Sequence, residues 1–108
     1  MVINLDDELG EGTHWTAAFR KDGRSHYFDP FGVEPDERTI AALTVREGEQ
    51  VAYNDSQIQD LESQRCGHYV KRWLELMIKT GSFYESLYKH FTQRPSEQNE
   101  RFAKFGNN

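Results

Sequence analysis

The chain has 108 residues, the size of one domain, and its 36% of hydrophobic residues allow only a small core. Its formal net charge of −5 argues against a nucleic-acid function that depends on neutralising phosphates. No apolar run is long enough to span a membrane, and the first residues do not resemble a secretion signal. A single cysteine cannot form an internal disulfide, so these features together predict a protein that is not secreted.

Four short segments rich in apolar or aromatic residues predict strands at residues 2–5, 13–20, 25–29 and 51–54. The second and third segments flank Lys-Asp-Gly, which is typical of a tight hairpin. The acidic segment 6–12 and the proline-containing segment 30–35 should be loops, because glycine and proline interrupt regular structure. Residues 35–45 predict a short helix with acidic residues in its first turn.

The clearest helix begins at Cys66, after a polar loop over residues 55–65. Apolar residues follow Cys66 at intervals that place them on one helix face: Tyr69, Val70, Trp73, Leu74, Met77 and Ile78. Gly81 should end this helix. A second helix should follow, marked by Phe83, Leu87 and Phe91 and closed by Pro95.

Strands that come first and helices that come last predict an α+β fold. We expect a small mixed or antiparallel sheet of about three to four strands, packed against a central helix that starts at Cys66, with a further C-terminal helix. Residues 1–94 would form one domain and residues 95–108 a polar, frayed tail, from which Phe102 and Phe105 could dock.

Cys66 allows two interpretations. At a helix N-terminus the partial positive charge and the unpaired N–H groups stabilise a thiolate, and Gly67 lets another chain approach closely. Cys66 could equally continue the apolar face, because free cysteine is often buried, and from the helix alone this second interpretation is favoured.

A nucleophilic cysteine needs a base, and the chain offers four histidines: His14, His26, His68 and His90. His68 lies roughly 200° around the helix from Cys66 and should not reach the thiol. A hairpin would bring His14 beside Asp29 on the next strand, as a Cys–His–Asp relay requires. Taken singly, His14 reads as a half-buried strand residue and Asp29 as a turn cap. One cysteine and scattered histidines lack the close spacing of a metal site, and we expect no metal or other cofactor.

Four motifs follow one another along the chain: "GTHW" (12–15), "YFDPFG" (27–32), "YNDSQIQ" (53–59) and "RCGHYV" (65–70). In this order they resemble the adenain-like and SUMO-protease-like cysteine proteases, which include viral, virophage and polinton-type maturation proteases. The resemblance covers about residues 2–80, and "DPFG" is especially similar to the viral branch.

The resemblance implies that Cys66 is the nucleophile, His14 the general base and acid, and Asp29 its orienting carboxylate. Gln59, seven residues before Cys66, would be the oxyanion-hole side chain; Gln57 and Gln64 match the family spacing less well. Without the family, Gln59 would read as a solvated loop amide. Trp15 would help to roof a narrow substrate tunnel, although it could also be a core aromatic, and Gly67 would allow the substrate to approach.

The resemblance further implies an endopeptidase that cleaves after Gly-Gly or Gly-X-Gly-type sequences in viral or mobile-element structural precursors. Alternatives are an isopeptidase or processing protease for a ubiquitin-like modifier, and a non-catalytic fragment that binds Gly-rich tails. The expected location is a virion or the host-cell interior.

Family members carry a sizeable region before the catalytic histidine, whereas thirteen residues precede His14 here. The chain would therefore be a fragment, a minimal enzyme, or one that an activating partner or a homodimer completes. A working relay predicts the Cys66 sulfur within about 3–4 Å of the nearer ring nitrogen of His14.

Overall fold

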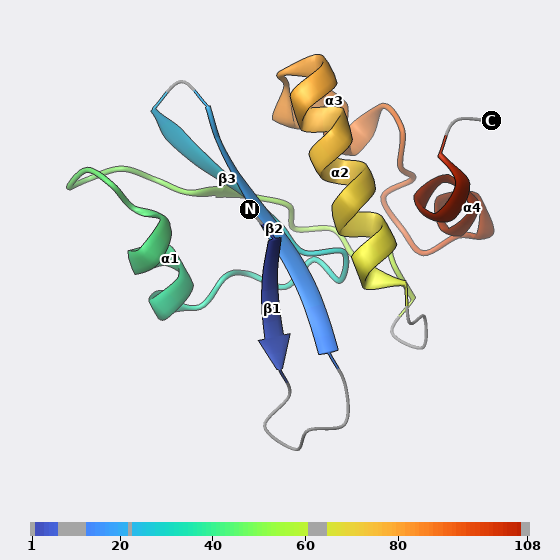
Figure 1. Ribbon diagram of the computed structural model, residues 1–108, viewed down its shortest axis with the longest axis horizontal. Coiled ribbons are helices and arrows are strands. Elements are labelled where there is room, and N and C mark those ends of the chain that lie inside the picture. The colour runs from blue at the N-terminus through green and yellow to red at the C-terminus, as the bar shows by residue number, and fades with distance from the viewer. Residues whose placement is uncertain (1, 7–12, 22, 61–64, 107–108) are drawn as a thin grey trace.

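Four strands form one mixed sheet in a computed structural model of the protein, which describes residues 2–6, 13–21, 23–60 and 65–106 (Figure 1). The strands are β1 (Val2–Asp6), β2 (Thr13–Lys21), β3 (Arg24–Phe28) and β4 (Ala52–Tyr53). They lie in the order β1-β2-β3-β4; the first three pair antiparallel, and β4 runs parallel to β3. The predicted α+β fold with a small mixed sheet is confirmed.

The β2–β3 hairpin forms at the predicted place. Its register pairs Lys21 with Arg24, and Gly23 has a φ of 76°, a left-handed conformation that glycine adopts without steric cost. Side chains alternate between the sheet faces. Trp15, Ala17 and Phe19 pack in the main core, while Ala18 lies in a smaller cluster on the other face.

In the described part of the chain, four helices accompany the sheet: α1 (Glu37–Leu43), α2 (Cys66–Thr80), α3 (Phe83–Tyr88) and α4 (Glu97–Phe105). The helix predicted over 35–45 is shorter than expected, because Asp36 caps its start by accepting a hydrogen bond from the Thr39 N–H. Residues 55–60 form a loop as predicted, and residues 61–64 lie outside the described part. No helix in the described ranges is both long and apolar enough to cross a membrane.

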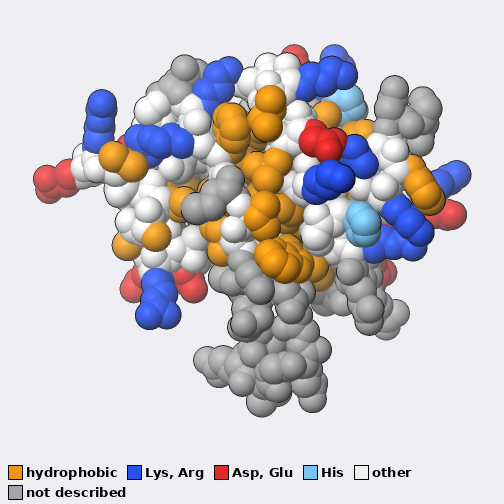
Figure 2. Space-filling view, in the orientation of Figure 1, with side chains coloured by type: hydrophobic (Ala, Val, Ile, Leu, Met, Phe, Trp, Pro, Cys, Tyr) orange, Lys and Arg blue, Asp and Glu red, His pale blue; other side chains and the backbone are white. Residues whose placement is uncertain are grey.

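Helix α2 is the central helix and begins at Cys66 as predicted. Trp73 is fully buried, with its ring stacked on Phe28 of β3 at 5.2 Å between centroids. Gly81 ends the helix in the left-handed conformation. Figure 2 shows apolar side chains gathered over the seam between β2 and α2, where Trp15, Phe19, Leu74 and Phe83 pack half-buried against the core.

One member of the predicted apolar face was assigned wrongly. Ile78 is 72% exposed, whereas Leu76, which was not assigned to that face, is buried. Each helical residue turns by about 100°, so Ile78 lies well off the buried face that ends at Met77.

The C-terminal part differs from the expectation in two ways. Helix α3 ends at Tyr88, although Phe91 beyond it is buried as predicted. The stretch expected to fray instead forms α4, because Ser96 caps it and Phe102 reaches the core. Phe105, the other residue expected to dock, is 70% exposed.

Candidate active site

His14 and Asp29 are brought together by the hairpin. His14 Nε2 lies 2.9 Å from Asp29 Oδ1. His14 is in β2, and Asp29 follows the last residue of β3, which pairs with Ala17. An ionised carboxylate only accepts hydrogen bonds, so Nε2 carries the ring proton and Nδ1 is left as the basic nitrogen.

The Asp29 carboxylate is held by its own turn. Its Oδ1 also accepts a hydrogen bond from the Phe31 N–H at 2.8 Å, and the Asp29 carbonyl accepts one from the Gly32 N–H at 2.8 Å. The residue is 2% exposed. Asp29 therefore caps a turn and orients a histidine at the same time, so the two interpretations of this residue are compatible.

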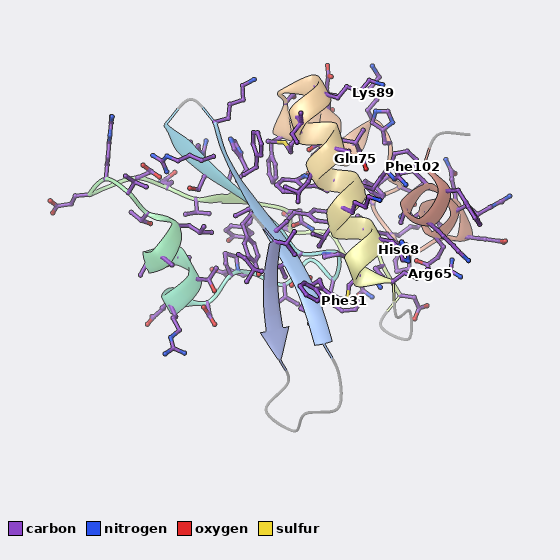
Figure 3. All side chains as sticks on the ribbon, in the orientation of Figure 1. Phe31, Arg65, His68, Glu75, Lys89 and Phe102 are labelled. Atoms are coloured by element: carbon purple, nitrogen blue, oxygen red, sulfur yellow. The ribbon has the colours of Figure 1, made fainter. Side chains whose placement is uncertain are left out.

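Phe31 fixes the plane of the His14 ring. The two rings stack with centroids 4.7 Å apart and an interplanar angle of 22°. Figure 3 shows Phe31 beside β2, toward the end of the molecule where Arg65 and His68 mark the start of α2. The imidazole is thus held along its edge by Asp29 and across its face by Phe31.

The thiol lies against the main chain of β2. The Trp15 N–H donates to Cys66 Sγ at 3.4 Å, which places the sulfur beside the residue that follows His14. Cys66 is 6% exposed, so it fills a core position while it occupies the helix N-terminus. A Cβ added at Gly67 would lie 3.8 Å from Trp15 Cδ1, so the first turn of α2 packs close to this indole ring.

The basic nitrogen of His14, Nδ1, does not hydrogen-bond the thiol. His14 Nδ1 is buried and has no hydrogen-bond partner among the described residues. The structure therefore contains the expected His14–Asp29 hydrogen bond and brings the thiol to the neighbouring backbone amide. Catalytic hydrogen bonds are often long in unliganded enzymes and tighten when substrate binds.

Gln59 is fully buried, which rules out the interpretation as a solvated loop amide. Its loop rests on the Asp29 turn, because the N–H groups of Ile58 and Gln59 both donate to the Pro30 carbonyl, at 2.9 and 3.0 Å. Gln57 is half-buried and donates its side chain to the Gln59 carbonyl at 3.0 Å. Gln64 lies outside the described residues.

The other histidines lie in different surroundings. His68 is exposed, as its position on α2 predicts. The ring of His26 lies with its centroid 5.1 Å from that of Phe83, and the ring of His90 stacks on Phe102 with the centroids 5.5 Å apart. Within the described ranges, no group of three or more His, Cys, Asp or Glu residues could hold a metal ion.

Two residues of the site were missed from the sequence. Phe31 stacks on His14, and Asn54 donates to and accepts from the Asp29 backbone. The available signal for Asn54 was its place at the end of a predicted strand. Using it required knowing that β4 pairs with β3 in parallel, with Tyr53 beside Tyr27.

Comparison of the chain with protein-family models, with curated proteins and with solved structures found no match. The motifs and the geometry around Cys66, His14 and Asp29 are therefore the features of the chain that point to a function.

Proposed function

We propose that this chain is a cysteine endopeptidase that cleaves after Gly-Gly or Gly-X-Gly-type sequences. One observation carries the proposal: a His14–Asp29 pair lies next in the chain to the amide that binds the Cys66 sulfur. A histidine oriented by a carboxylate beside a cysteine at a helix start is the arrangement that nucleophilic thiol catalysis needs. The proposed substrates are viral or mobile-element structural precursors, and the proposed location is a virion or the host-cell interior.

The first chemical step uses the free ring nitrogen of His14. Nδ1 takes the proton from the Cys66 thiol, and the thiolate attacks the carbonyl carbon that follows glycine. Asp29 keeps the proton on Nε2 and stabilises the imidazolium that forms. Cys66 Sγ exchanges its contact with the Trp15 N–H for the new bond to carbon.

The oxyanion is bound by the Cys66 N–H at the start of α2 and by the Gln59 side chain. As the tetrahedral intermediate collapses, His14 gives its proton to the leaving amine and a thioester remains on Cys66. Water then attacks the thioester while His14 accepts a proton from it, and the thiol is released protonated.

The proposed substrate class comes from the family resemblance, and the position of Trp15 beside Gly67 is compatible with it. A Cβ added at position 67 would make an ordinary van der Waals contact with the indole ring, so this ring lies beside the first turn of α2. A tunnel roofed by Trp15, which the family resemblance implies, would admit residues without side-chain bulk, and glycine next to the cleaved bond satisfies this condition. Together with the motif order, the position of Trp15 beside Gly67 supports the choice of Gly-rich sequences as substrates.

The test combines cleavage and covalent capture. A fluorogenic Gly-Gly-X peptide and a Gly-Gly peptide with a thiol-reactive end are incubated with the wild type and with Cys66→Ala, His14→Ala and His68→Ala. We expect Cys66→Ala to lose both cleavage and labelling, His14→Ala to lose nearly all cleavage, and His68→Ala to behave as the wild type. Full cleavage by Cys66→Ala would refute the proposal.

A second candidate is a module that binds Gly-rich tails without cutting them. Its specific support is that His14 Nδ1 and the thiol are not hydrogen-bonded. This candidate predicts binding of the Gly-Gly peptide with no covalent capture by the reactive analogue. An isopeptidase acting on a ubiquitin-like modifier would instead cleave a modifier–fluorophore conjugate much faster than the short peptide.

A further inference from the structure

Asn54 is a buried amide at the point where β4 ends. The parallel pairing of β4 with β3 sets Tyr53 beside Tyr27. This register brings Asn54, the residue after β4, next to the end of β3. Asn54 therefore reaches the residue that carries the candidate carboxylate, although the two are 25 positions apart in the chain.

The Asn54 side chain binds both main-chain polar groups of Asp29. Its Oδ1 accepts a hydrogen bond from the Asp29 N–H at 2.9 Å, and its Nδ2 donates to the Asp29 carbonyl at 2.6 Å. The amide thus replaces the backbone partner that a longer β4 would supply. Two bonds to one residue hold its backbone against both rotation and translation.

The same amide also reaches toward the loop that carries Gln59. Asn54 Nδ2 lies 3.4 Å from the Ser56 carbonyl, and the backbone at Ser56 packs against Gly32 of the Asp29 turn. The Asn54 side chain binds the Asp29 main chain on both sides. Asn54 and the turn at Phe31 and Gly32 therefore both hold the residue whose carboxylate bonds His14 Nε2.

We propose that Asn54 is a positioning residue of the candidate active site, which fixes the Asp29 backbone so that the carboxylate holds His14 in the tautomer with a basic Nδ1. The inference rests on the proposed function for its catalytic meaning. Its structural content, control of the His14–Asp29 hydrogen bond by Asn54, can be tested whether or not the chain is a protease.

The experiment follows the His14 Nε2 proton by NMR. A ring N–H held by a buried carboxylate exchanges slowly and resonates far downfield, and the signal is assigned by its loss in His14→Gln. We expect Asn54→Ala to abolish or shift this signal. The control Ser25→Ala should keep it, since Ser25 is also buried and loses comparable bonds, to the Leu43 carbonyl and to Arg20, without contacting Asp29.

The kinetic arm measures peptide cleavage by the same variants. Asn54→Ala should lower kcat by about 10–100-fold, the range for loss of a group that orients a functional histidine, with little change in KM. Ser25→Ala should leave both constants near the wild-type values. If Asn54→Ala does not fold, Asn54→Asp keeps the side-chain volume and the acceptor for the Asp29 N–H but cannot donate to the Asp29 carbonyl, and it should also lose the signal.

The outcomes separate the two proposals. An unchanged downfield signal in a folded Asn54 variant would overturn the positioning role. The signal could disappear in Asn54→Ala as expected while the wild type neither cleaves the peptide nor is labelled. This result would support the positioning role and refute the protease. An unchanged kcat in Asn54→Ala beside an active wild type would also overturn the inference.

Discussion

The Asp29 oxygen Oδ1 accepts two hydrogen bonds, from the Phe31 N–H and from His14 Nε2. The first bond closes a turn and the second orients a ring, so the geometry of the turn is transmitted to the imidazole. Because Asp29 is almost completely buried, its carboxylate has little access to water. A single side chain in this way couples the local fold of the "DPFG" motif to the chemistry proposed for His14.

Gln59 can be tested as a donor to the oxyanion. Removing one such donor lowers kcat by about 10²–10³-fold, because the charge that develops on the substrate oxygen loses a preorganised hydrogen bond. We expect this loss in Gln59→Ala and in the nearly isosteric Gln59→Glu, with KM little changed, measured on the fluorogenic peptide.

The matched control is Gln57→Ala. Gln57 lies on the same loop and donates one hydrogen bond to the Gln59 carbonyl, so its removal tests the loop without removing the proposed donor. It should reduce kcat far less than the Gln59 variants. Equal losses in the two would mean that the loop geometry, and not the Gln59 amide, matters for the rate.

Among the site residues, the sequence predicted those whose positions follow from their order along the chain. It did not predict those whose positions depend on how the strands pair. His14 and Asp29 could be placed together because a two-residue hairpin has only one plausible register. The role of Gln59 came from the family resemblance alone, since its burial depends on the turn on which it rests. Asn54 was missed because the strand predicted at 51–54 does not reveal that it pairs in parallel with β3, which is what brings Asn54 to Asp29.

Two loops pack closely where Gly32 meets the backbone of residues 56–57. A Cβ at position 32 would lie 2.6 Å from the Ser56 carbonyl carbon and 2.7 Å from the Gln57 nitrogen, and the φ of Gly32 is 72°. Both the space and the backbone conformation therefore require glycine. This contact joins the turn that holds Asp29 to the loop that carries Gln59.

Gly32→Ala should destabilise the protein strongly, because strain at a positive φ of about 1–3 kcal/mol is added to a clash with backbone that cannot move aside. Gly48→Ala is the matched control, since Gly48 has a φ of 81° but nothing within 4 Å of an added Cβ. Urea denaturation should show a distinctly larger loss for Gly32→Ala. Similar losses for the two would mean that the turn and the loop are not tightly packed.

Helices α2 and α4 differ in how clearly the sequence predicts them. The buried residues of α2 recur at helical spacing over fifteen residues, so the periodicity is unmistakable. In the nine residues of α4, only Asn99, Phe102 and Ala103 are buried, and one of these is polar. A helix anchored by so few apolar contacts resembles a solvated tail until its packing partners are known.

Across the whole molecule, the C-terminal segment is tied to the loop of the candidate site. Asn99 of α4 donates to the Ile58 carbonyl at 3.0 Å and also binds Thr92 and Arg94. Arg72 of α2 donates to the Phe102 carbonyl at 3.1 Å. The radius of gyration of 13.4 Å is that of one compact domain of about this length.

Phe102 and Phe105 offer a direct test of this attachment, because they lie on one helix and differ in burial. Phe102→Ala should lower the free energy of unfolding by about 3–5 kcal/mol, since a large buried ring is lost and a cavity remains. Phe105→Ala, with a largely exposed ring, should change it by no more than about 0.5 kcal/mol. Equal, small effects in urea denaturation would show that the helix does not dock.

The approach of Trp15 to Gly67 has a practical consequence. The chain has two tryptophans; Trp73 is sealed in the core, while Trp15 is half-buried at the start of α2, where the thiol lies. Indole emission depends on the polarity and quenching groups around the ring. A chain with Trp73→Phe would fluoresce from Trp15 alone, so that arrival and departure of a ligand at Cys66, and the acylation proposed there, could be followed optically in real time, without any attached dye.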